Sequence, residues 1–99
     1  MAKFALCVEL KAKPGKESEV EAFLKKEAAL VGGEPGTLTW CAAKDEATPG
    51  AYTIFDTFVD EAAREIHLNG EAGRELVEKA DALFLETPKV RRFQVIVEK

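Results

Sequence analysis

The sequence is poor in the residues that metal sites and disulfide-rich proteins need. It has one histidine, His67, and only two cysteines, Cys7 and Cys41. One histidine and two well-separated cysteines do not match the ligand spacing of a zinc site. Two cysteines also cannot build a disulfide framework. The sequence therefore predicts neither a metal centre nor a disulfide-stapled fold.

Long apolar runs and an excess of basic charge are missing as well. No stretch approaches the ~20 apolar residues of a membrane span, and Glu9 and Lys11 interrupt the apolar segment near the N-terminus, so no leader is predicted. The net charge of −4 gives no basic surface for nucleic acid. The 99 residues contain no repeat and no linker, so we expect one cytoplasmic domain over residues 1–99.

Periodicity predicts both strands and helices. Alternation of apolar and polar residues indicates strands over residues 4–11, 37–44, 51–59 and 89–98. Apolar residues at steps of three and four indicate helices over residues 16–31, 60–68 and 71–85. Ser18 and Glu21 fit a capping box for the first helix, although Gly15 could equally mark its start. Asp60 is expected to cap the second helix.

The order of these elements predicts an α+β fold, a ferredoxin-like βαββαβ plait whose second helix is split in two. In this plait the helices cover one face of an antiparallel sheet with the strand order 4-1-3-2. Cys7 and Cys41 would then lie two strands apart, at roughly 10 Å. A disulfide needs a shorter distance, so we expect two free thiols.

The second face of the sheet is also expected to be apolar. Ile54 and Phe58 share one face of the third strand, whereas Phe55 lies on the other. Helices can cover only one of these faces, and an uncovered apolar face is a typical association surface. We therefore expect a homodimer in which two sheets face each other and form a closed barrel.

Three segments carry a resemblance to a known family: LKAKPGKESEVEAFL, EPGTLTW and FDTFVDEAAREIHLNG. With them, nearly the whole chain resembles the antibiotic biosynthesis monooxygenase family of small dimeric α+β barrel proteins. The resemblance implies a homodimer with a pocket in each subunit between the helices and the sheet. Several members oxidise phenols or quinols with molecular oxygen and use no metal, flavin or other prosthetic group. Others degrade haem, and some relatives are isomerases.

The haem-degrading members use an asparagine, a tryptophan and a histidine. Here Cys7 and Val8 stand where the asparagine is expected, and His67 stands where the tryptophan would be. Val77 lies near the place of the haem-ligating histidine. The resemblance therefore argues against haem degradation.

His67 is the candidate catalytic residue. Its spacing from Ala63 places it at the edge of the apolar stripe, facing the expected pocket. A neutral imidazole there could accept a phenolic proton. The alternative is a histidine at the edge of the core, bonded to the backbone.

The other candidates are aromatic residues for the wall of the pocket and two charged residues in support. The aromatic candidates are Trp40, Tyr52, Phe55, Phe58 and Phe84, which core packing would explain equally well. Asp56 is a supporting carboxylate, paired with Arg92 or Lys11, or else a solvated strand residue. Because strand residues alternate, only one of Phe55 and Asp56 can face the pocket.

These observations predict a cofactor-independent monooxygenase that oxidises a small aromatic phenol, quinol or polyketide-like substrate with molecular oxygen. One alternative is a non-catalytic dimeric ligand-binding module, and another is a small-molecule isomerase in which His67 shuttles a proton. A cavity lined by His67 and Trp40 would favour an enzyme. A cavity filled by Phe55, Phe58 and Phe84 would favour the binding module.

Overall fold

The computed structural model describes residues 2–99, which form one four-stranded antiparallel sheet and three helices. The strands are β1 (Phe4–Lys11), β2 (Thr37–Lys44), β3 (Ala51–Phe58) and β4 (Lys89–Gln94). The helices are α1 (Glu17–Val31), α2 (Glu61–Leu68) and α3 (Glu71–Leu83). The strand order β2-β3-β1-β4 is the predicted one, so the α+β ferredoxin-like plait is confirmed.

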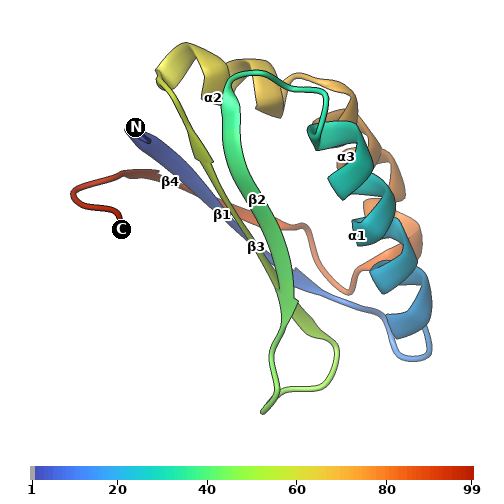
Figure 1. Cartoon of the computed structure of the whole chain (residues 1–99). Coiled ribbons are helices and arrows are strands. Elements are labelled where there is room, and N and C mark those ends of the chain that lie inside the picture. Colours follow the sequence, from blue (N-terminus) through green and yellow to red (C-terminus); the bar gives the residue numbers. More distant parts are fainter. Residues whose placement is uncertain (1) are drawn as a thin grey trace.

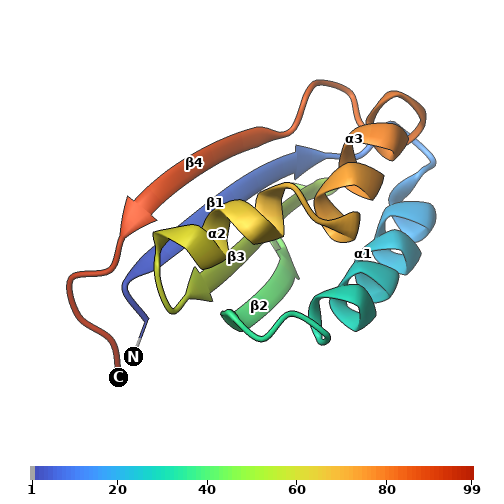
Figure 2. The ribbon, with the colours of Figure 1, turned by 90° about the horizontal axis from the view of Figure 1, so that it is seen from above.

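All three helices lie on one face of the sheet (Figures 1 and 2). Alternation along β1 and β3 turns one set of side chains toward the helices, and Leu6, Leu10, Ile54 and Phe58 from this set are buried. They form the core together with apolar residues of α1 such as Val20 and Leu24. Burying a side chain of this size contributes about 2 kcal/mol each.

The predicted helix ends are partly right. Asp60 caps α2 as expected, because its Oδ1 accepts a hydrogen bond of 2.8 Å from the backbone N–H of Ala63. The prediction that Ser18 and Glu21 form a capping box is wrong. The helix begins at Glu17, so Ser18 already lies inside it, and the side chain of Glu21 accepts a hydrogen bond from Tyr52 instead.

The third helix and the fourth strand are both shorter than predicted. The α3 helix ends at Leu83, because Phe84 is extended and bridges to Ala12 of the neighbouring segment. Within α3, the side chain of Val77 is exposed. The β4 strand ends at Gln94, where its pairing with Phe4 of β1 ends as well.

The face of the sheet away from the helices is uncovered in the single chain. Cys7 and Cys41 flank Phe55 across three strands, and both thiols are free, as predicted. Phe55 is 43% exposed and Phe93, on the same face, is 41% exposed.

None of the helices in residues 2–99 has both the length and the apolar character to cross a membrane.

A close contact joins the turn before β2 to the second helix. A Cβ atom on Gly36 would lie 2.5 Å from the Cβ of Ala63 in α2. No side chain fits at that distance, so glycine is required here by the close approach of two segments. This contact sets how near the turn, which contains Glu34, lies to α2.

Candidate functional site

The one histidine lies between two carboxylates in the interior. Nδ1 of His67 lies 2.7 Å from Oε1 of Glu34, and Nε2 lies 3.0 Å from Oδ2 of Asp56. The imidazole also packs at a tilt against the ring of Phe58, with 5.3 Å between ring centroids. The cluster therefore joins α2, which carries the histidine, to β3 and to the turn before β2.

The two carboxylates favour the protonated imidazole. Burial by itself lowers the pKa of His67, but its contacts with the carboxylates of Asp56 and Glu34 outweigh this effect and raise the pKa above its usual value. In a neutral imidazole one nitrogen is an acceptor and would face a carboxylate lone pair. The cluster is therefore best described as an imidazolium held by two carboxylates.

Asp56 is the most enclosed member of the cluster. Burial raises the pKa of its carboxyl, although the nearby imidazole of His67 acts against this. The contact with Nε2 is an ion pair of 3.0 Å. Neither oxygen of Asp56 receives a well-aligned hydrogen bond from a described residue. The carboxylate of Glu34 has a second hydrogen-bond partner. The hydroxyl of Thr37 donates a hydrogen bond of 2.8 Å to Oε1, the same oxygen that faces His67.

A buried carboxylate on α1 adds to the negative charge of this region. Burial and the charge of Glu75 raise the pKa of Glu27 from 4.5 to about 7, whereas the charge of His67 lowers it. Among the described residues, Oε2 of Glu27 has no hydrogen-bond partner. Glu27 therefore carries a proton over part of the physiological pH range.

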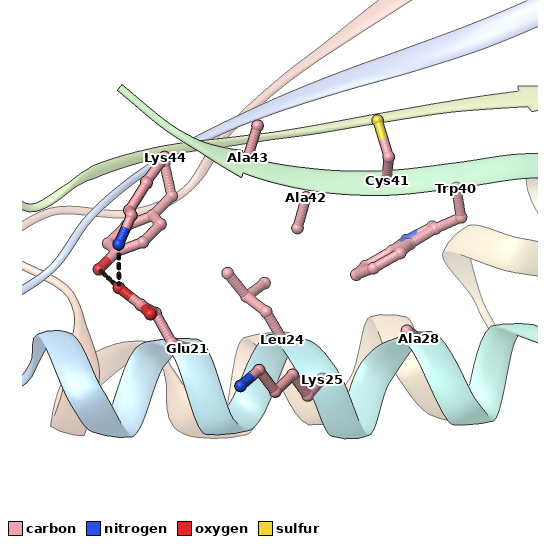
Figure 3. Close-up of a pocket in the computed structure, with 10 residues that line it drawn as sticks. Glu21, Leu24, Lys25, Ala28, Trp40, Cys41, Ala42, Ala43 and Lys44 are labelled. Atoms are coloured by element: carbon pink, nitrogen blue, oxygen red, sulfur yellow. Dashed lines mark hydrogen bonds and ion pairs between the residues drawn. The ribbon is translucent and has the colours of Figure 1, made fainter. Parts of the chain in front are cut away.

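A cleft of about 410 Å³ lies between α1 and β2 (Figure 3). Its lining is mostly apolar, and its residues are Glu21, Leu24, Lys25, Ala28, Trp40, Cys41, Ala42, Ala43, Lys44 and Tyr52. The indole of Trp40 extends from β2 toward α1 and forms one end. The opposite end is polar, with Glu21 and Lys44. Because β2 is an edge strand, the cleft opens at the side of the sheet.

Trp40 connects the cleft to the charged cluster. It is paired with Asp56 across β2 and β3, so both side chains lie on the helix-facing side of the sheet. A second hollow of about 300 Å³ lies on the other side of Trp40 and is lined by Thr37, whose hydroxyl bonds to Glu34. One indole therefore contacts two hollows and neighbours a carboxylate that binds His67.

The structure brings some of the predicted site residues together and separates others. Trp40 and Tyr52 line the cleft, whereas Phe58 and Phe84 are buried in the core. Phe55 lies on the uncovered face, because alternation along β3 directs Asp56 to the helix side instead. The cleft is therefore not filled by these phenylalanines.

The charged candidates Arg92, Asp56 and His67 have other contacts than the sequence predicted. Arg92 does not pair with Asp56, because it pairs with Glu65 of α2 at 3.7 Å, and the partner of Asp56 is His67. His67 is buried and is not among the residues that line either hollow. Its role as a proton acceptor stays a prediction, and both of its nitrogens are already committed to carboxylates.

Sequence reasoning missed three carboxylates. Glu34 could have been noticed, since it opens the Glu-Pro-Gly segment on which the family resemblance rests. Glu27 lies three residues after Leu24 and four before Val31, so the helical period could have placed it on the buried face of α1. Glu21 has no such signal. Within residues 2–99, no three His, Cys, Asp or Glu side chains converge as a metal ion requires.

The layered plait, with a cleft between its helices and its sheet, defines a small α+β protein with room for one small molecule. The sequence matches the antibiotic biosynthesis monooxygenase family over residues 4–79, which is most of the chain. The protein therefore belongs to the antibiotic biosynthesis monooxygenase family. No curated protein matches the sequence.

Solved structures with the same fold include a protein of unknown function from Nitrosomonas europaea. It is 37% identical, with a TM-score of 0.94, and the match covers 100% of this chain and 94% of that one. A Pseudomonas aeruginosa protein is 22% identical with a TM-score of 0.84, over 98% and 97% of the two chains. An antibiotic biosynthesis monooxygenase is 20% identical with a TM-score of 0.83, over 95% and 99%. At these identities, the last two structures establish a common fold and no more.

Proposed function

We propose that the protein is a cofactor-independent oxygenase of a small aromatic phenol or quinol, which binds in the cleft between α1 and β2. The observation that carries this proposal is the cleft itself, whose volume of about 410 Å³ is in the range of small-molecule sites. An apolar lining with one tryptophan suits a flat ring. Membership of the monooxygenase family supports the class of reaction.

The chemistry in this proposal belongs mainly to the substrate. The phenol loses its proton, and the electron-rich anion passes an electron to molecular oxygen. One oxygen atom is then bonded to a ring carbon and the other leaves as water, so that a phenol and O₂ give a quinone and water. The cleft contributes by excluding water and by holding the ring in place.

His67 has a supporting role in this proposal. It contacts Asp56, which is the cross-strand neighbour of Trp40. Its contact with Glu34 fixes the turn that leads into β2. The cluster therefore holds the tryptophan end of the cleft in position.

Oxygen uptake by the purified protein tests the proposal. With a panel of quinols and anthrones, at least one compound is expected to give uptake above the rate without protein. Ala28→Phe should lower this rate by at least about tenfold, because Ala28 lines the cleft and the added ring fills it. Ala29→Phe is the matched control, since Ala29 is the next residue of α1, is exposed and does not line the cleft.

The alternatives give different results in the same experiment. Conversion of a ligand without oxygen uptake would support an isomerase. Binding that Ala28→Phe abolishes, without any conversion, would support a non-catalytic ligand-binding module. Either result would contradict the oxygenase proposal.

A further inference from the structure

The polar end of the cleft is built from two side chains that meet at the carboxylate of a third, Glu21. The hydroxyl of Tyr52 in β3 donates to Oε2 of Glu21 at 2.8 Å. Nζ of Lys44, at the end of β2, lies 3.7 Å from the same oxygen (Figure 3). Among residues 2–99, no hydrogen bond reaches the other oxygen of Glu21, Oε1.

Glu21 is the one carboxylate among the residues that line the cleft in the described chain. Tyr52 is already a donor, and burial together with Glu21 raises its pKa to about 12, so its proton stays in place. Lys25 and Lys44 carry ammonium groups, which donate hydrogen bonds and have no acceptor. The thiol of Cys41 points away from α1, toward the uncovered face of the sheet (Figure 3).

The apolar part of the cleft leads to this carboxylate. Leu24 and Ala42 lie between Trp40 at one end and Glu21 at the other (Figure 3). A ring packed against these side chains directs a ring hydroxyl toward either the indole or the carboxylate. A carboxylate accepts a phenolic O–H in a strong, charge-assisted hydrogen bond, whereas an ether oxygen offers it no proton.

We propose that Oε1 of Glu21 receives the phenolic O–H of the ligand, and that Glu21 is the catalytic proton acceptor of the cleft. The second part rests on the proposed oxygenase function. In this step the O–H bond of the phenol breaks, its electron pair stays on the phenolate oxygen, and the proton forms the carboxylic acid of Glu21. Lys44, beside Oε2, stabilises the new negative charge on the phenolate. The proton later leaves with the oxygen atom that becomes water.

Binding tests the recognition part without any turnover. We would measure the dissociation constants of 1-naphthol and of its methyl ether, 1-methoxynaphthalene, by calorimetry. The native protein is expected to prefer the naphthol by about tenfold, the usual value of one partly exposed hydrogen bond to a charged group. Glu21→Gln should abolish the preference, and Glu19→Gln should keep it, because Glu19 is exposed on the same helix and pairs with Lys16.

The rate of oxygen uptake tests whether Glu21 is the proton acceptor. With the compound that gives oxygen uptake, Glu21→Gln should lower kcat by about a hundredfold, as expected for the loss of a general base. Glu21→Asp retains a carboxylate and should lower kcat less. Both variants are compared with the native protein by thermal unfolding, and the Asp variant gives the answer if the Gln variant does not fold.

The outcomes separate the two proposals. If the native protein takes up oxygen and Glu21→Gln is as fast and as selective as the native protein, the role of Glu21 is overturned. If Glu21→Gln loses the preference for the naphthol but no compound gives oxygen uptake, the oxygenase proposal fails and Glu21 stands as the residue that recognises the hydroxyl. If the native protein binds the naphthol and its ether equally, recognition by Glu21 is overturned whatever the rate.

Discussion

Nδ1 of His67 lies 2.7 Å from Oε1 of Glu34, and this contact fastens the last turn of α2 to the turn that leads into β2. The partners are 33 residues apart in the chain, and neither lies in a strand. Asp56 faces the other side of the ring. Loss of the histidine would therefore leave two carboxylates near each other without a cation between them.

His67→Gln should destabilise the protein most at low pH. Because the folded state raises the pKa of His67, the stabilisation is complete below the unfolded value of 6.5 and is lost as the pH rises through the folded value. At pH 6 the loss of unfolding free energy should be about 3 kcal/mol, as for other broken buried ion pairs. Denaturant unfolding at pH 6 and pH 9 measures this. An equal loss at both values would contradict the charged imidazole.

Glu27→Gln should stabilise the protein at alkaline pH. The pKa of Glu27 is raised from 4.5 to about 7, so its stabilising contribution is complete below about pH 4.5 and is lost as the pH rises to about 7. Above that pH the folded protein keeps a buried charge that glutamine removes. The gain should be about 1–3 kcal/mol at pH 8 and close to zero at pH 5. Thermal unfolding at both pH values checks this, with the exposed Glu78→Gln as the control.

Tyr52 should ionise far above the usual range of a tyrosine. Burial, and then the hydrogen bond to Glu21, raise its pKa from 10.0 to about 12. Because the sequence has a single tyrosine, ultraviolet titration follows this residue alone. In Glu21→Gln the pKa should fall but stay above 10, since burial is the larger cause. A native pKa near 10 would show that the polar end of the cleft is open to water.

The uncovered face of the sheet should join two copies of the chain. Phe55 and Phe93 are both substantially exposed there, and a stable dimer would cover them. We expect a dimer mass by light scattering at micromolar concentration, and a monomer mass for Phe55→Lys. Ile66→Lys is the control, because Ile66 is 69% exposed but lies on α2, on the opposite side of the sheet. A monomer mass for the native protein would refute the expected dimer.

The plait could be predicted from the sequence because the hydrophobic patterns that indicate its strands and helices are local. Period-two alternation in FALCVELK and AYTIFDTF places β1 and β3, and the element order then limits the topology. It also assigned Ile54 and Phe58 to one face and Phe55 to the other, as observed. The predicted ends of elements were wrong where tertiary contacts determine them. Phe84, for example, is not helical because it forms a β-bridge with Ala12.

The candidate site was harder to predict because its contacts are long-range. Asp56 and His67 are separated by a strand end and most of a helix, and Glu34 comes from a third segment. Arg92 was a plausible partner for Asp56, since both lie on the helix-facing side of the sheet, but Glu65 of α2 is its partner instead. Periodicity fixes the face on which a residue lies, and it does not choose among charged neighbours on that face.

Gly36 has a consequence for how this chain can be altered. Its missing Cβ lets the turn approach Ala63, three residues after the cap of α2 and four residues before His67. Any side chain at position 36 pushes these two segments apart, and the distance between Glu34 and His67 increases with them. The spacing within the charged cluster is therefore set by a residue that carries no charge. An engineer who wishes to retune the pKa of His67 has a steric control at position 36 that leaves every ionisable group in place.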